Sequence, residues 1–228
     1  MELTVWEERT KVISDHSWGL WSRLINKYGP ERTLGGVTDK GQYWKEGYVW
    51  WKKISDLIED KSYVIEYGAG AGRVANAAIM DCEKMLLYEP CPDVRMALND
   101  CAQDWAETER VKTWISTKFD AKSWGVPSAI MCINVLNHLS YEEVWEFMAR
   151  CAKISSQGTR VVVYRRRDWG YNYEVLQYAL TKDWPAYHWE LGQLKAMFST
   201  HGFKYVESDD EDETYSLDVF MKGYNSES

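Results

Sequence analysis

The chain has 228 residues, 45% of them hydrophobic, which is typical of one folded domain with an extension and excludes a disordered tail. It shows neither a secretory signal nor an apolar run near the roughly 20 residues of a transmembrane helix, so we expect no membrane partner. The five scattered cysteines match no metal-ligand spacing and suit a reducing cytoplasm, while the net charge of −8 makes nucleic acid an unlikely partner.

Residues 1–60 predict a helical N-terminal extension. Apolar residues at helical spacing predict one helix that Gly29 and Pro30 end, and a second helix over residues 43–58. A polar, glycine-containing loop lies between them. The extension holds six of the 13 tryptophans: Trp6, Trp18, Trp21, Trp44, Trp50 and Trp51. We expect most of these indole rings to pack the helices onto the rest of the protein.

The pattern changes at Lys61, where strands begin to alternate with helices. Strands are predicted over 63–67, 85–88, 111–115, 129–133, 160–164, 203–206 and 216–222; helices are predicted over 73–81, 94–105, 141–154, 172–182 and 189–200. This alternation predicts an α/β fold with a mostly parallel seven-stranded sheet and helices on both faces. The acidic run 207–213 is predicted to be the turn of a final hairpin, which makes the last strand antiparallel.

A glycine-rich loop follows the first predicted strand. Gly68, Gly70 and Gly72 allow a sharp turn and a close approach of a ligand to the backbone. Glu89 ends the next strand, which is the position of a ribose-binding acid in nucleoside-binding folds. Glu66, two residues before the first glycine, would repel a pyrophosphate but attract an ammonium group. The loop therefore favours a zwitterionic nucleoside ligand.

A dinucleotide oxidoreductase fits this loop less well. Its fingerprint requires a small residue at the sixth position, counted from the first glycine. Arg73 occupies that position here, and we expect so bulky a side chain to obstruct close packing of helix on strand.

At these residues the chain resembles the class I S-adenosylmethionine-dependent methyltransferases, over about residues 60–222. Residues 66–72 are similar to the first motif of that family, Glu89 to its second, and residues 134–139 to its fourth-strand signature. The resemblance implies a 61–228 domain that binds S-adenosyl-L-methionine through Glu66, Gly68, Ala69, Gly70, Gly72, Glu89, Pro90, Asn134 and Val135. The resemblance also implies a residue that binds the adenine amino group of the cofactor, and this residue could be Ser116, Thr117 or Asp120.

The resemblance also implies methyl transfer to a nitrogen or oxygen atom of a small-molecule substrate. His138 follows the fourth strand and is the candidate catalytic base or acceptor contact; its alternative role is a helix-entry residue bonded to the backbone. Tyr43 and Trp44 would belong to a lid formed by residues 1–60. Tyr164 and Arg165, after the fifth strand, would face an anionic substrate or form a solvated loop.

Other functions of the same fold stay open. One is a methyltransferase for protein or nucleic acid, which the nearly balanced charge outside the acidic run disfavours. Another is a catalytically silent subunit or scaffold, although such a protein has no need of Glu66, the glycines and Glu89 together. The sequence gives no indication of the acceptor atom or of the oligomeric state.

Overall fold

The computed structural model describes residues 40–106, 112–119, 124–166, 189–209 and 215–223, together with Ser22, Ile25, Asn26 and Gly29. Several sequence predictions lie outside these residues: most of the first helix, the loop before residue 40, the helix over 172–182, and Asp120. The remaining predictions can be compared with the structure.

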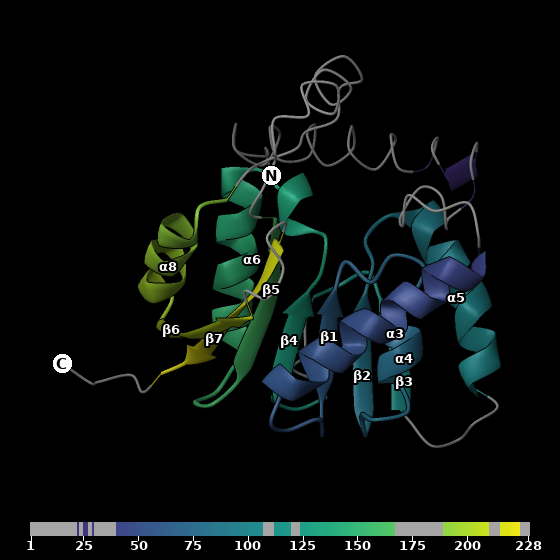
Figure 1. Ribbon diagram of the computed structural model, residues 1–228, viewed down its shortest axis with the longest axis horizontal. Coiled ribbons are helices and arrows are strands. Elements are labelled where there is room, and N and C mark those ends of the chain that lie inside the picture. Colours follow the sequence, from purple (N-terminus) through teal and green to yellow (C-terminus); the bar gives the residue numbers. More distant parts are fainter. Residues whose placement is uncertain are drawn as a thin grey trace, which may run out of the picture.

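A seven-stranded sheet with the strand order β3-β2-β1-β4-β5-β7-β6 forms the centre of the molecule (Figure 1). Its strands are β1 (Val64–Tyr67), β2 (Lys84–Tyr88), β3 (Lys112–Ser116), β4 (Ala129–Cys132), β5 (Arg160–Arg166), β6 (Phe203–Asp209) and β7 (Tyr215–Lys222). β1 to β5 pair in parallel, whereas β7 is antiparallel to both β5 and β6. The predicted fold class, with its antiparallel last strand, is confirmed.

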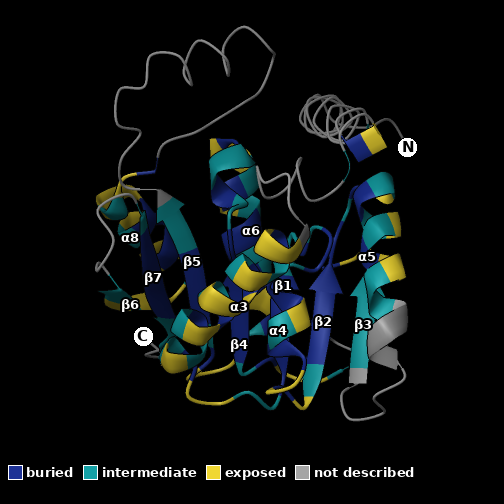
Figure 2. Cartoon of the chain, turned by 45° about the vertical axis from the view of Figure 1, so that its right-hand side comes forward, coloured by how far each residue is buried: buried dark blue, intermediate teal, exposed yellow. Residues whose placement is uncertain are grey.

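Helices cover both faces of the sheet. α3 (Lys40–Leu57), α4 (Ala75–Ala78) and α5 (Pro92–Ala106) pack on one face; α6 (Tyr141–Ile154) and α8 (Leu191–Thr200) pack on the other. Successive residues of a strand point to opposite faces, so Val64 contacts the first group of helices and Ile65 the second. Because both faces are covered, β4 is apolar throughout and β1 is apolar except near its end, at Glu66; both strands lie in the buried layer of Figure 2.

α3 lies directly against the turn that follows β1. Its Trp51 is buried, and the indole Nε1 donates a hydrogen bond of 2.7 Å to Oδ2 of Asp81, which lies in the turn after α4. A Cβ atom added at Gly47 would meet the backbone oxygen of Arg73 at 1.9 Å. Only glycine permits this approach, so α3 and the glycine-rich loop form one packed unit.

Two predicted elements differ from the structure. The helix predicted over 73–81 is regular only from Ala75 to Ala78. On its N-terminal side the chain forms turns, in which Gly72 O and Val74 O accept backbone hydrogen bonds. The acidic run is not wholly a turn, because its first residues, from Glu207 to Asp209, continue β6 and pair with β7. This edge strand faces solvent on one side and tolerates acids there, and Asp209 lies 3.7 Å from the ammonium group of Lys53.

Candidate functional site

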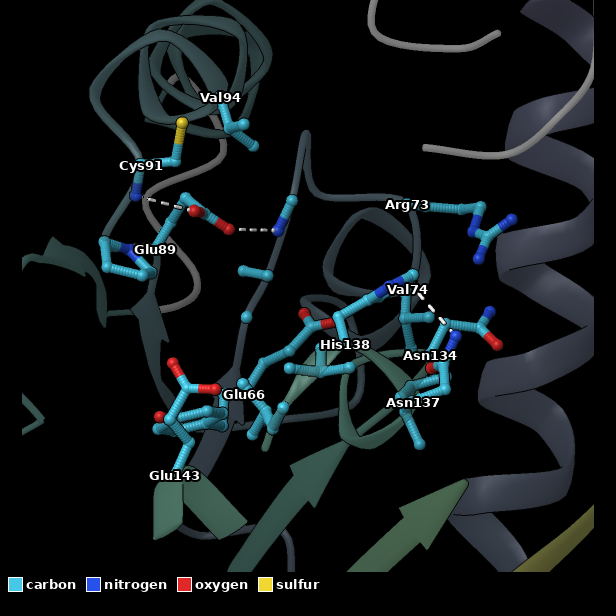
Figure 3. A pocket seen from close by; sticks show the side chains of 18 of the residues that line it. Glu66, Arg73, Val74, Glu89, Cys91, Val94, Asn134, Asn137, His138 and Glu143 are labelled. Carbon is cyan, nitrogen blue, oxygen red and sulfur yellow. Dashed lines mark hydrogen bonds between the residues drawn. The ribbon is translucent and has the colours of Figure 1, made fainter. Parts of the chain in front are cut away.

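A pocket of about 300 Å³ opens at the carboxyl ends of β1, β2 and β4. One side consists of the glycine-rich loop and of residues 89–94, which follow β2. The other side is the connection from β4 to α6, and Tyr43 of α3 contributes a further wall. Figure 3 shows Glu89 and Cys91 at one end of this pocket and Asn134 and Asn137 at the other. Parallel sheets generally bind ligands at this edge.

The glycine-rich loop is folded against the end of β2 by backbone hydrogen bonds. Gly68 N and Ala69 N both donate to Tyr88 O, at 2.8 and 3.0 Å. Gly68 and Gly70 have φ angles of 73° and 59°, which side chains rarely allow. A Cβ atom at Gly68 would also lie 2.5 Å from Val135 Cγ2, across the pocket floor. The loop is therefore held closely between β2 and the β4 connection.

Glu89 is fixed by the same backbone. Its Oε2 accepts from Gly70 N and its Oε1 from Cys91 N, each at 2.9 Å. Burial raises the pKa of Glu89 to about 7, although these two N–H groups and Arg95 lower it. Each carboxylate oxygen keeps a second lone pair, so the side chain can still accept hydrogen bonds from two neighbouring hydroxyl groups of a ligand.

Glu66 is the most unusual acid of the pocket. The residue is 3% exposed, and its Oε2 has no hydrogen-bond partner. Burial raises the pKa of Glu66 to about 8; the charge of Arg73 lowers it, and that of Glu89 raises it. The carboxyl group accepts a backbone hydrogen bond from Ala75, but its Oε2 has none, and a buried polar atom without a partner is costly. A cationic hydrogen-bond donor in the pocket would supply what Glu66 lacks.

Arg73 lines the pocket without blocking it. Its Nη1 lies 3.4 Å from Glu46 Oε2, and its guanidinium group lies 5.4 Å from the ring centre of Tyr43. The side chain thus extends toward α3, and the packing of α4 on the sheet is preserved. This shows how the loop accommodates an arginine that the dinucleotide-binding pattern excludes.

The four residues predicted to contact substrate lie in different places. Tyr43 is buried and lines the pocket, and Trp44 contacts its ring edge-on at 5.0 Å without lining the pocket. Tyr164 packs against Trp50 instead, with ring centres 5.1 Å apart. Arg165 forms an ion pair with the buried Asp218, Nε to Oδ2 at 2.6 Å. The structure therefore brings Tyr43 alone of the four to this pocket.

The β4–α6 connection carries the remaining predicted residues. Asn134 has a φ of 59°, the left-handed conformation, and a 3₁₀ turn, η1 (Leu136–His138), follows it. Trp189 Nε1 donates to Leu136 O at 2.8 Å, and a capping box of Ser140 and Glu143 begins α6. This turn exposes His138 to the pocket.

All nine predicted cofactor-binding residues lie at or next to the pocket. Eight of them line it, and Gly72 lies within the same loop. Sequence reasoning assigned no ligand contact to Cys91, Val94, Asn137 or Glu143, which also line it. Their positions in the first turns after β2 and β4 are a usable signal. Of the adenine candidates, Ser116 and Thr117 do not line the pocket; the Ser116 hydroxyl bonds Lys118 O instead.

The described part of the chain has neither a membrane-spanning helix nor a metal-binding cluster. No helix there is long and apolar enough to cross a membrane. Among the same residues, no group of three or more His, Cys, Asp or Glu side chains could hold a metal ion.

No protein-family model matches the sequence, and no curated protein matches it. Solved structures do match. Magnesium protoporphyrin IX methyltransferase from Synechocystis PCC 6803, with SAH bound, has a TM-score of 0.65 and 13% identity over 91% of this chain and 100% of that chain. N,N-8-amino-8-demethyl-D-riboflavin dimethyltransferase from Streptomyces davawensis has a TM-score of 0.64 and 14% identity over 91% of this chain and 62% of that chain. Mitomycin 7-O-methyltransferase has a TM-score of 0.65 and 12% identity over 96% and 69%. The chain thus has the fold of the class I S-adenosylmethionine-dependent methyltransferases.

Proposed function

We propose that the protein is an S-adenosyl-L-methionine-dependent methyltransferase that acts on a nitrogen or oxygen atom of a small molecule. The observation that carries this proposal is Glu66, a buried acid with an unpaired oxygen next to a glycine-rich loop. A shared fold alone does not imply activity, so the assignment of function rests on the residues of the pocket.

The residues of the pocket fit the parts of this cofactor. Glu66 suits the ammonium group of its methionine end, because an opposite charge stabilises a carboxylate that burial otherwise neutralises. Glu89 suits the two ribose hydroxyls, since both of its oxygens are oriented by backbone N–H groups. Pro90 and Val94 offer apolar contact for the base. The cofactor supplies an electrophilic methyl group on a sulfonium.

The chain's own contribution is to hold the two reactants in the orientation for direct transfer. Tyr43, buried in the wall of the pocket, keeps water out. His138 is the group of the β4–α6 connection that can receive a proton from the acceptor. Its Nε2 lies 3.2 Å from Asn137 Nδ2, so its orientation is held by a neighbour.

The segment before β1 belongs to the same proposal, as a lid over a domain of residues 61–228. Besides Tyr43, Ile25 is buried in contact with Cys91 and Val94, which line the pocket. All five cysteines are free, which suits a reducing compartment such as the cytoplasm. Deletion of residues 1–42 should reduce turnover more than cofactor affinity.

Two calorimetric titrations test the central proposal. We expect S-adenosylhomocysteine to bind and NADH not to bind; no binding of S-adenosylhomocysteine would sink the proposal. Incubation with the methyl-labelled cofactor and a cell extract then identifies the acceptor class. Label in the low-mass fraction supports a small-molecule acceptor, and label in protein or nucleic acid supports the alternative.

A further inference from the structure

Asn137 is the second polar group of the pocket that lacks a partner. It lies in the η1 turn and lines the pocket, and its Oδ1 is buried without a hydrogen bond. The other end of the same amide is occupied, because Nδ2 lies 3.2 Å from His138 Nε2. Buried polar atoms are nearly always paired in native proteins, so an unpaired carbonyl oxygen in a pocket indicates a ligand atom that donates to it.

The turn that carries Asn137 is held in place by contacts with other parts of the chain. Trp189 holds the preceding residue through its bond to Leu136 O. Asn134 is in the left-handed conformation, and Val135 is wedged against Gly68. A fixed acceptor of this kind is suited to selecting between ligands.

The cofactor does not need this oxygen. Glu66 provides a charged group for the ammonium, and Glu89 provides two oxygens for the ribose. Asn137 is uncharged and lies away from Glu89, at the opposite end of the pocket (Figure 3). The group left for Asn137 is therefore a neutral N–H or O–H on the second reactant.

We propose that Asn137 Oδ1 accepts a hydrogen bond from the methyl acceptor and so selects acceptors that carry an N–H or O–H group. This inference rests on the proposed function, because it assumes that a second reactant enters the pocket beside the cofactor. The same amide contacts His138 Nε2 through its Nδ2. An amide N–H donated to Nε2 occupies the lone pair of the neutral imidazole, so His138 can take a proton from the acceptor only when this contact opens.

The test uses fragment pairs in which methyl groups replace the donor hydrogens: phenol against anisole, and aniline against N,N-dimethylaniline. Each is titrated by ligand-observed NMR against the full chain saturated with S-adenosylhomocysteine. We expect wild type to prefer the donor of each pair by about fivefold, the typical worth of one neutral hydrogen bond. Asn137→Leu should abolish the preference, and Asn137→Asp, which keeps an acceptor oxygen, should retain it.

Asn99→Leu is the matched control, because Asn99 is exposed on α5, outside the pocket lining, and should leave the preference unchanged. Equal binding of both members by wild type, or an unchanged preference in Asn137→Leu, overturns the inference; so does the absence of saturable binding by any donor fragment. A loss of S-adenosylhomocysteine affinity in Asn137→Leu would place the residue in the cofactor site and also overturns it.

The failure of this inference can be distinguished from failure of the proposed function. In the second case wild type itself does not bind S-adenosylhomocysteine. A merely structural role for Asn137 is tested by comparing its two variants, because both lose the Nδ2 contact with His138 and only Asn137→Leu loses the acceptor oxygen. A structural role predicts that both variants lose the donor preference, whereas the inference predicts that only Asn137→Leu loses it.

Discussion

The two sides of the pocket are built in different ways. On the glycine-loop side, Glu89 is held by the N–H groups of Gly70 and Cys91, which belong to the β1–α4–β2 segment and the turn that follows it. On the opposite side, the turn that carries Asn137 and His138 is held by Trp189, from a distant part of the sequence. The first side depends on backbone and local order, and the second on one long-range side-chain contact. A site assembled in this way can keep its cofactor while its acceptor end changes.

Gly68→Ala should have the largest effect, because Gly68 is where the two sides touch. The new Cβ would require a left-handed alanine and would lie 2.5 Å from Val135 Cγ2. We expect a loss of about 3 kcal/mol in the free energy of unfolding, measured in urea. Gly158→Ala is the control, since its φ is 86° with nothing near the added atom, and it should lose only about 1 kcal/mol.

A double variant sharpens this result. Val135→Ala in the Gly68→Ala background should restore part of the lost stability by removing the colliding methyl groups. Absence of any recovery would mean that the two sides are not in contact through this pair.

Glu89→Ala should weaken cofactor binding on the glycine-loop side and leave the opposite side of the pocket unchanged. The change removes the proposed ribose contact and leaves two backbone N–H groups without their acceptor. We expect about a 50-fold loss in affinity for S-adenosylhomocysteine by calorimetry. Glu83→Gln, an exposed acid outside the pocket lining, should leave the affinity unchanged. An equal affinity in Glu89→Ala would remove Glu89 from the cofactor site.

The pH dependence reports on Glu66. Its pKa in the free protein is about 8 against an ordinary 4.5, so between these values the folded chain binds more protons than the unfolded chain. Stability of the free protein should therefore fall as pH rises through this window, and less steeply in Glu66→Gln. An ammonium ligand favours the ionised carboxylate, so its affinity should rise with pH, by about tenfold per unit at most. A flat affinity profile from pH 6 to pH 8 would contradict the assigned contact.

Trp189→Phe should have the smallest effect and should touch only the acceptor side. An aromatic ring remains at this position, but the hydrogen bond to Leu136 O is lost. Loss of this bond should lower the free energy of unfolding in urea by about 1 kcal/mol. Amide signals should shift over residues 134–139 and not over 66–72. Trp145→Phe is the control, because that exposed indole packs against Tyr141 and His201, away from the η1 turn. Shifts spread equally over both segments would show that the two sides are not independent.

The sequence predicts the sheet and the glycine-loop side well, for the same physical reason. The alternation of apolar strands and amphipathic helices is local, and so is the order of Glu66, the glycines and Glu89. The seven strands follow from this local pattern, and the resemblance to class I methyltransferases implies the cofactor candidates, eight of which line the pocket. Helix and strand ends are less predictable, as the continuation of β6 through Asp209 shows.

Tertiary contacts decide the rest, and they are not visible in the spacing of residues. Arg165 could be placed at the end of β5, but its partner Asp218 lies on β7 and holds it by an ion pair. Arg73 was expected to obstruct packing of helix on strand, yet its guanidinium group extends away from the strand and pairs with Glu46 on α3. The position of Asn137 after β4 is a signal, but its unpaired oxygen is not visible in the sequence, because such an atom exists only once the surrounding side chains are placed.

The contact between Gly47 and the backbone of Arg73 constrains the order in which the chain assembles during synthesis. α3 leaves the ribosome before any strand of the sheet, and the surface that receives it is made from residues that follow. Until β1 and α4 exist, the apolar face of α3, with Trp51 and Ile54, has nothing to cover it. The nascent chain therefore carries this apolar face before it carries the strands that cover it, and mutations that slow formation of the first strands should lower yield in cells before they lower the stability of the finished protein.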